Sequence, residues 1–467
     1  GGDTGYGLSV FHGMKVEKFD VKVLGVMKQV LNGRDSILIR ISGDVLGKNN
    51  VVRGMSGSPI YIKNKLVGAL SYGFDFSMEP IVGVTPIVDM LDAIIKPTDQ
   101  RTLRLTGHSL ESSSMPLSIS SIEGSGQELD RLKCSMMSTS LGAGAPKMVP
   151  LMSPVALSGF SSRARTFLAD RFKGLGLDVS GGASGGLNKE LSNLEGGAAN
   201  RLVPGSALGL LLSTGDFSSA ATGTVTGIFH DRVLGFGHPL MEAGAIDVPM
   251  ASAYIHEVLP SLSVSFKLSS PLKVLGRIFA DRPWSVGGEL GKNASMIPVD
   301  ITVIDGQRHF RKDFSSQVIN HPNLSSDLIS AIIMSAMDAS FQSTDPYIVN
   351  LKSQIKIKDG RLLEREDSFA SFASASSGLS ILGLKFFSDP VVNYVDSIVS
   401  RIYNNRYKKE EVESVKLTIT FNVGKNTTAL KRVIAEDPVV EPGEKVRFTC
   451  VLSPYNKIGR ASCRERV

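Results

Sequence analysis

Alternating apolar and polar positions dominate the first 95 residues of the chain. The segments 19–26 (FDVKVLGV) and 36–41 (SILIRI) are rich in β-branched residues and predict strands. Residues 59–72 (PIYIKNKLVGALSY) predict a hairpin that turns at residues 63–65, and residues 86–95 predict a short helix. The N-terminal block is therefore expected to be a dense β-domain.

The pattern changes several times along the remaining residues. Ser, Thr and Gly dominate residues 98–145, which favours a linker. Helical spacing follows at 162–173, and later at 323–342 and 390–403. Strand alternation returns in KLTITFNV and KVRFTCVL, which is typical of a small Ig-like β-sandwich. The predicted divisions are a β-domain (1–97), a linker and helical region (98–200), a second β-domain (201–320), a helical or mixed region (321–410) and a partial sandwich (411–457).

Composition narrows the class of protein. A chain of 467 residues is too long for one compact core, and 42% hydrophobic with 21% charged residues is ordinary for a globular protein. The 47 glycines suit many short turns between strands. The net charge of +6 is not concentrated in a basic stripe with aromatics, so no nucleic-acid partner is expected. No apolar stretch of about 18 residues predicts a membrane-spanning helix.

The two ends of the sequence look altered. The chain begins with Gly1 rather than an initiator methionine, so its start is expected to be processed or missing. Residues 458–467 (IGRASCRERV) resemble a translated sequencing adapter and are expected to be an artefact that replaces the natural C-terminus. Without that tail only Cys134 and Cys450 remain, which make neither a disulfide framework nor a metal site.

The segment 54–59 (GMSGSP) is the strongest candidate for chemistry. It lies between an extended stretch and a strand, so its serine is expected on a tight loop. A nucleophilic hydroxyl must project from such a loop beside backbone N–H groups that face the developing oxyanion. Glycines at 54 and 57 permit unusual dihedrals and leave the N–H groups of Gly54 and Ser56 accessible as an oxyanion hole. A simple β-turn of small residues would use the same composition.

Two segments resemble the SpoIVB-type serine peptidases. Residues 54–72 (GMSGSPIYIKNKLVGALSY) resemble the family's serine-bearing segment, and residues 223–239 (GTVTGIFHDRVLGFGHP) resemble the one that carries its histidine. The resemblance spans about 1–95 and 201–260. It implies a chymotrypsin-like double β-barrel split over the two β-rich blocks, with Ser56 as nucleophile and His238 as general base. Here the histidine follows the serine, the reverse of the order in the sporulation peptidase.

Other candidates for the base and for the acid remain open. His12 lies 44 residues before Ser56, in the order found in chymotrypsin-like enzymes, but it lacks the Gly-His pair. The resemblance implies Asp44 as the residue that orients the base, although a turn in Ser-Gly-Asp explains it equally well. Asp247 and Asp216, nearer His238, are alternatives to Asp44.

Several common kinds of site are missing from the sequence. It has no phosphate-binding GxxxxGK[ST] loop, no HExxH and no paired CxxC, so neither a metal nor another cofactor is expected. We therefore expect a mainly β protein that cleaves a protein substrate through an acyl-enzyme on Ser56. The resemblance places it outside the cytoplasm, with a possible link to the membrane or cell envelope. The alternatives are a non-catalytic envelope scaffold and a peptidase that only processes itself.

Overall fold

The computed structural model describes residues 2–31, 33–47, 51–74, 77, 79–95, 148–179, 185–261, 264–341, 347–370, 389–424, 428–436, 439, 443, 446–454 and 461–466. Most of the predicted linker, and Cys134 within it, lies outside these ranges. The chain divides into two compact units, Gly1–Pro298 with Ser316–Ile332 and Val299–Ser315 with Ile333–Val467. No helix in the described ranges is long and apolar enough to cross a membrane.

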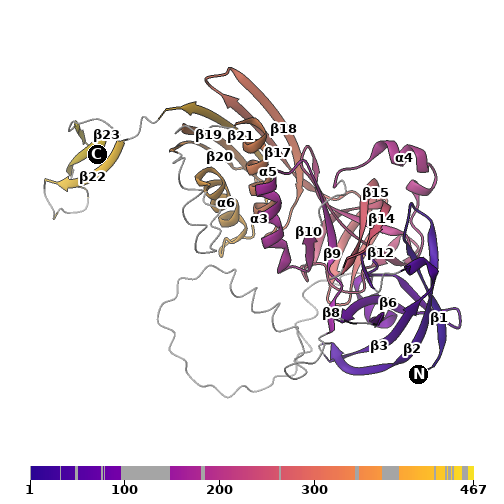
Figure 1. Ribbon diagram of the computed structural model, residues 1–467. Coiled ribbons are helices and arrows are strands. Elements are labelled where there is room, and N and C mark those ends of the chain that lie inside the picture. The colour runs from indigo at the N-terminus through magenta and orange to yellow at the C-terminus, as the bar shows by residue number, and fades with distance from the viewer. Residues whose placement is uncertain are drawn as a thin grey trace, which may run out of the picture. The chain divides into compact units, whose positions relative to one another are not determined.

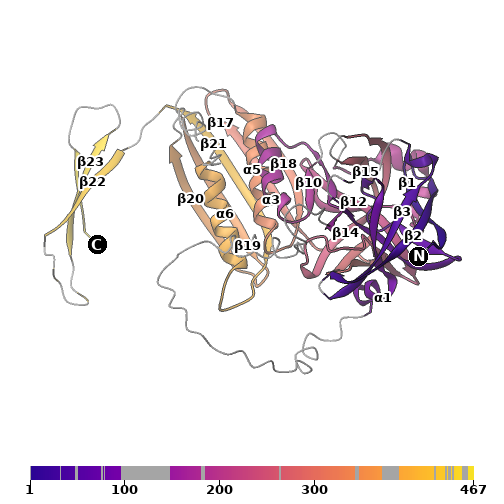
Figure 2. The same ribbon diagram turned by 60° about the horizontal axis from the view of Figure 1, so that its bottom comes forward.

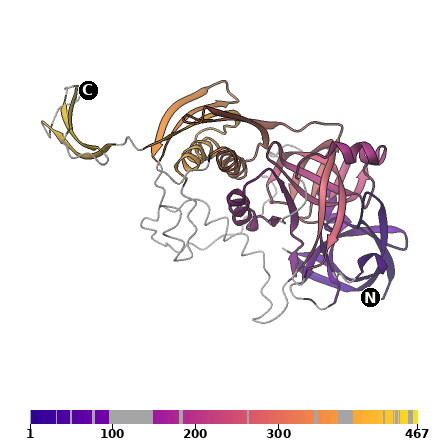
Figure 3. The ribbon, with the colours of Figure 1, turned by 45° about the horizontal axis from the view of Figure 1, so that its top comes forward.

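Six strands of the N-terminal region close into a barrel. The elements of this region are β1 (Thr4–Val10), β2 (Val16–Leu31), β3 (Arg34–Ser42), η1 (Asp44–Leu46), β4 (Val52–Arg53), β5 (Pro59–Ile62), β6 (Lys65–Phe74), β7 (Ile81–Pro86), α1 (Ile87–Met90), η2 (Leu91–Ala93) and β8 (Met148–Pro150). The order β5-β1-β2-β3-β7-β6 returns to β5, and these indigo strands form a ring in Figure 3. Inward residues such as Phe19, Ile39 and Ile41 fill it, as the alternation predicts.

The expected hairpin and short helix are both present in this barrel. Strands β5 and β6 are joined by Lys63 and Asn64, whose φ angles of 51° and 62° are those of a tight hairpin turn. The helical turns α1 and η2 follow β7 within the predicted range. The local sequence pattern was therefore sufficient to place these elements.

A second ring of six strands lies in the same unit. Its region contains β9 (Ser153–Ser158), α3 (Ser162–Lys173), β10 (Leu177–Val179), α4 (Lys189–Glu195), η3 (Ala198–Asn200), β11 (Ala207–Gly215), β12 (Ser218–Phe229), β13 (Arg232–Gly235), β14 (Gly244–Leu259), β15 (Ser265–Arg282) and β16 (Ser285–Leu290). The order β12-β13-β16-β15-β14-β11 closes because β11 also pairs with β12. Figure 1 labels β12, β14 and β15 of this ring. The predicted double-barrel core is confirmed.

Residues 148–200 contribute more than a linker. Strand β8 pairs with β6 of the first barrel, and β9 pairs with β12 of the second. The helix α3 covers the predicted residues and is capped at its start by the Ser161 hydroxyl, which accepts from the amide of Ala164 at 3.3 Å. This region therefore extends both barrels.

The second unit is built on a sheet in the order β17-β21-β19-β20. Three elements run across the division between the units: β17 (Met296–Asp305), β18 (Phe310–Ile319) and α5 (Ser325–Ser340). The others are β19 (Tyr347–Ile357), β20 (Leu362–Ala370), α6 (Pro390–Tyr403) and β21 (Val412–Val423). The helix α6 lies along one face of the sheet in Figures 2 and 3 and buries Val391, Val395 and Val399, four residues apart.

The C-terminal strands do not all belong to one sheet. Strand β21 pairs with β17 and β19 in the large sheet. A separate sheet contains β22 (Thr428–Ala435), β23 (Arg447–Pro454) and β24 (Ala461–Arg466). The Ig-like sandwich remains a prediction.

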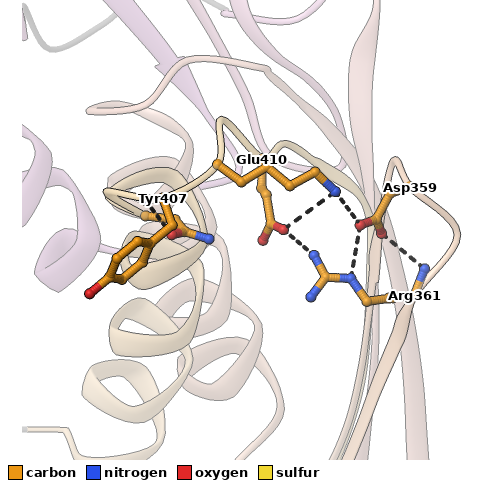
Figure 4. A network of polar contacts seen from close by, with 6 residues as sticks. Asp359, Arg361, Tyr407 and Glu410 are labelled. Atoms are coloured by element: carbon orange, nitrogen blue, oxygen red, sulfur yellow. Dashed lines mark hydrogen bonds and ion pairs between the residues drawn. The ribbon is translucent and has the colours of Figure 1, made fainter.

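An exposed ion-pair network ties the turn after β19 to the segment before β21. Asp359 accepts from Lys408 at 3.0 Å and from Nε of Arg361 at 2.8 Å, and Arg361 also pairs with Glu410 (Figure 4). Hydrogen bonding from Lys408 contributes most to lowering the pKa of Asp359 to about 2. The neighbouring Tyr407 is fully exposed and takes no part in these ion pairs. The network fastens a turn and does not resemble a reactive site.

Candidate active site

The GMSGSP segment forms a tight loop between β4 and β5, as predicted. Gly54 and Gly57 have φ angles of 95° and 94°, in the region that only glycine adopts without strain. The amide of Met55 donates to Val52 at 3.0 Å, and that of Ser58 donates to the carbonyl of Met55 at 2.9 Å. Two successive turns therefore place Ser56 at the centre of the loop.

Strand β12 of the second barrel binds this loop by donating hydrogen bonds to the carbonyl groups of the loop. The hydroxyl of Thr224 donates to the carbonyl of Gly54 at 2.9 Å, and the amide of Thr224 donates to the carbonyl of Ser56 at 2.9 Å. The hydroxyl of Thr226 donates to the carbonyl of Gly57 at 2.7 Å. The loop therefore lies where the two barrels meet, and three of its carbonyls are held by threonines about 170 residues away.

Only some of the backbone amides of the loop donate hydrogen bonds within the structure. The N–H of Gly57 donates to Leu70 at 2.8 Å, and that of Ser58 is bonded within the turn. Among the described residues, no acceptor takes the N–H of Gly54 or of Ser56. These are the two donors that the sequence suggested for an oxyanion hole, and in this structure they remain available for one.

The side chain of Ser56 is fully buried, and its hydroxyl has no hydrogen-bond partner among the described residues. A buried hydroxyl without a partner costs about 1–3 kcal/mol. Native proteins contain few such groups, and a catalytic role is one of the recurring reasons for them. The hydroxyl is therefore desolvated but not yet activated by a base.

His238 lies in the segment between β13 and β14, with 2% of its surface exposed. Its Nδ1 is 2.7 Å from the carbonyl oxygen of Pro239, which can only accept, so Nδ1 carries the proton. Nε2 is then an acceptor, and it too has no partner in the described part of the chain. Burial lowers the pKa of His238 to about 4, so the imidazole is neutral at pH 7.

The histidine segment and the serine loop meet, but their reactive atoms do not bond. A Cβ on Gly57 would lie 2.4 Å from the amide nitrogen of Phe236, two residues before His238. The carbonyl of Gly237 accepts from the Thr85 hydroxyl at 2.6 Å, which fixes this segment on the first barrel. No hydrogen bond joins the Ser56 hydroxyl to His238. The structure therefore brings both residues to one region without forming the expected pair.

The other predicted residues do not contact this pair. Asp44 is exposed on η1, and the Nδ1–H of His238 is bonded to a carbonyl rather than to a carboxylate. His12 is exposed after β1, with its ring against Tyr254 at 6.3 Å between centroids. Asp247 accepts from Arg277 at 3.2 Å. Asp216 lies in the turn between β11 and β12. Within the described ranges, no group of three or more His, Cys, Asp or Glu could hold a metal ion.

Sequence patterns did not indicate Asp281, which shapes the segment after His238. Its buried carboxylate accepts the amides of Leu240 at 2.8 Å, Met241 at 2.8 Å and Ala243 at 3.1 Å. Burial raises the pKa of Asp281, and these three hydrogen bonds oppose the shift. No motif surrounds it in the sequence, and its role depends on contacts about 40 residues away. Lys267, buried beneath the serine loop, was missed for the same reason.

Asp281→Asn is expected to destabilise the first unit by about 1–3 kcal/mol, because the amide group can replace only one of the two accepting oxygens and leaves a buried N–H unpaired. Chemical denaturation at pH 7 measures the change. Asp170→Asn, at an exposed position of α3, is the matched control and should change stability by less than about 0.5 kcal/mol. Equal stability of both variants would show that Asp281 does not hold the segment.

A comparison with known families identifies the serine-bearing barrel. Residues 4–88 match the family model of SpoIVB peptidase S55. The matched range contains Ser56, Gly54, Asp44 and His12, and it ends before His238, so the resemblance over 201–260 remains a prediction. No curated protein matches the chain. No solved structure matches it either. The GMSGSP loop lies inside the matched barrel, so the serine-bearing part of the chain, residues 4–88, is similar to the SpoIVB-type peptidases.

Proposed function

We propose that this chain is a serine peptidase that hydrolyses a protein substrate through an acyl-enzyme on Ser56. The observation that carries the proposal is the state of the GMSGSP loop inside the matched barrel. Its central hydroxyl is desolvated, and in the part of the chain that the structure describes neither this hydroxyl nor the N–H groups of Gly54 and Ser56 have a hydrogen-bond partner. A tetrahedral oxyanion needs two such donors beside the nucleophile. The family resemblance favours an extracytoplasmic substrate, such as a protein of the cell envelope.

The proposed roles follow from the chemistry of each group. Ser56 attacks the substrate carbonyl, and the two loop amides stabilise the oxyanion. His238 is the proposed base, since its tautomer leaves Nε2 free to accept a proton. Both side chains are buried, so the acyl step requires a movement of the loop or of the segment after β13 that admits substrate and brings Nε2 to the hydroxyl.

A non-catalytic envelope scaffold is the second candidate. It is favoured by the complete burial of the Ser56 hydroxyl and by the lack of a hydrogen bond between this hydroxyl and any histidine in the described ranges. The loop would then serve only to join the barrels through Thr224 and Thr226.

Labelling with a fluorophosphonate probe separates the two functions. The probe is expected to form an adduct on Ser56 of the folded wild-type chain, assigned by fragment ions of the peptide 54–63. This adduct should be absent from Ser56→Ala. Ser153→Ala is the matched control, because Ser153 is also buried with an unpaired hydroxyl but lies outside the loop. A folded sample that takes no label on the loop would favour the scaffold.

A further inference from the structure

A row of three buried polar side chains lies beside the serine loop. The Nζ of Lys267, on β15, donates to the hydroxyl of Ser9, on β1, at 2.8 Å. The hydroxyl of Ser58 donates to the same Ser9 oxygen at 3.1 Å. Ser58 is the second serine of GMSGSP, so this row connects the loop to an amine through one intervening hydroxyl.

Lys267 has an unusual environment for a lysine. Only 1% of its surface is exposed, and its aliphatic stem lies against Gly54, where a Cβ would be 3.1 Å from the lysine Cδ. Its Nζ lies 5.6 Å from the centroid of the Phe11 ring. No carboxylate among the described residues forms an ion pair with it. Burial is the sole cause that lowers the pKa of Lys267, to about 7, so a large share of the amine is uncharged near neutral pH.

The two serines of the loop therefore differ in their connection to a base. Among the described residues the hydroxyl of Ser56 has no partner, whereas that of Ser58 is joined through Ser9 to an amine. An uncharged amine is a competent general base, and buried lysines with lowered pKa values serve this purpose in catalysis. A lysine retained only for stability would be expected to have a carboxylate partner.

We propose that Lys267 is a proton acceptor for this loop and that Ser58, connected to it through Ser9, is a second hydroxyl able to take the acyl group. The inference rests on the proposed function, because it places the same acyl chemistry in the same loop. This inference differs from the proposed function in the reacting hydroxyl and in the base, so either one can fail while the other holds.

The proton and electron movements balance without a further reactant. As the Ser58 oxygen bonds to the substrate carbonyl carbon, its proton passes to Ser9, and the Ser9 proton passes to the uncharged Lys267. The carbonyl π electrons move to the oxygen. Collapse then breaks the C–N bond, and the ammonium of Lys267 returns a proton through Ser9 to the departing amine. Water, deprotonated by the same route, then bonds to the ester carbonyl carbon. The bond from that carbon to the Ser58 oxygen breaks, and the ammonium of Lys267 returns the proton through Ser9 to this oxygen, which restores both Ser58 and the uncharged amine.

The test uses the whole chain with Ser56→Ala, so that any adduct on the loop must lie on Ser58. The fluorophosphonate is expected to modify Ser58 at a rate that rises with pH and has its midpoint near pH 7. Adding Lys267→Met or Ser9→Ala should slow the modification about 100-fold or more, the usual contribution of a general base. Ser36→Ala, at a buried serine bonded to a carbonyl of the same barrel, should leave the rate unchanged.

Lys267→Arg separates a base from a structural cation. Arginine can donate to Ser9 but cannot accept a proton at these pH values, so modification of Ser58 should be lost. Wild-type rates in the arginine or methionine variant would overturn the proposal, as would a folded protein in which Ser58 is never modified. An adduct confined to Ser56 would support the proposed function and overturn this inference. No adduct on either serine would overturn both.

Discussion

Gly57→Ala is expected to prevent the first unit from folding stably, with a loss of more than about 4 kcal/mol in the free energy of unfolding. A Cβ at this position would lie 2.1 Å from the carbonyl oxygen of Thr224 and 2.4 Å from the amide nitrogen of Phe236. Both are backbone atoms of the second barrel, one in β12 and one directly after β13, so relief requires the two barrels to separate at the loop. The φ angle of 94° adds a further penalty for any L-residue. Thermal unfolding monitored by circular dichroism measures the effect.

Gly244→Ala is the matched control for this substitution. Gly244 has a φ angle of 76°, and a Cβ there would meet nothing within 4 Å. Its replacement therefore costs only the dihedral penalty, about 1–2 kcal/mol. Comparable losses of unfolding free energy in the two variants would mean that the loop is not packed tightly against the second barrel. A large loss in Gly57→Ala alone would show that it is.

Local patterns in the sequence predicted the elements of this fold well. Helix α6 occupies residues 390–403 as expected, because Asp389 caps its start, proline follows at the first position, and the valines repeat every four residues. The β5–β6 hairpin was equally clear from its alternation and short polar turn. Each of these signals is contained in fewer than about 15 neighbouring residues, which is why sequence reasoning could find them.

Long-range pairing could not be predicted in the same way. Strand β4 pairs in parallel with β15 through Val52 and Ser265, more than 200 residues apart. That pairing places the serine loop against the second barrel, and no local sequence pattern predicts it. The family-like motifs at Ser56 and His238 implied, through the resemblance, a double barrel split over the two β-blocks. They did not predict that both reactive atoms would be buried without a mutual bond.

Lys267 illustrates why part of the site was missed. On β15 it shares a buried face with Ser265 and Ser269, while Phe266 and Leu268 point to the less buried side. A strand with lysine and serines on one face and apolar residues on the other predicts the opposite orientation. The face is buried because β1 and the serine loop cover it, and that covering depends on residues about 200 positions or more away.

Lys267→Met is expected to raise the free energy of unfolding at pH 6 by about 2–4 kcal/mol. Burial holds the pKa of Lys267 near 7 in the folded state, against an ordinary value of 10.5. Below pH 7 the amine is charged in both states, and the folded state bears the full cost of a buried cation. Between pH 7 and 10.5 the amine is uncharged in the folded state but still protonated in the unfolded state. The free-energy cost of burying Lys267 therefore falls as pH rises, and it is gone once the unfolded state also loses the proton. The gain from methionine should therefore shrink across that interval.

Urea denaturation of wild type and Lys267→Met at pH 6 and pH 10 measures this dependence, and Lys273→Met is the control. Lys273, on the same strand, is exposed and bonds only Asn200 among the described residues, so its replacement should change stability by less than about 0.5 kcal/mol. A Lys267→Met variant that is less stable than wild type at pH 6 would mean that the cation is stabilised in the fold, and hence that it is not held as an uncharged base. Greater stability combined with loss of Ser58 modification would assign the lysine to catalysis, because the variant that fails to react would be the better-folded protein.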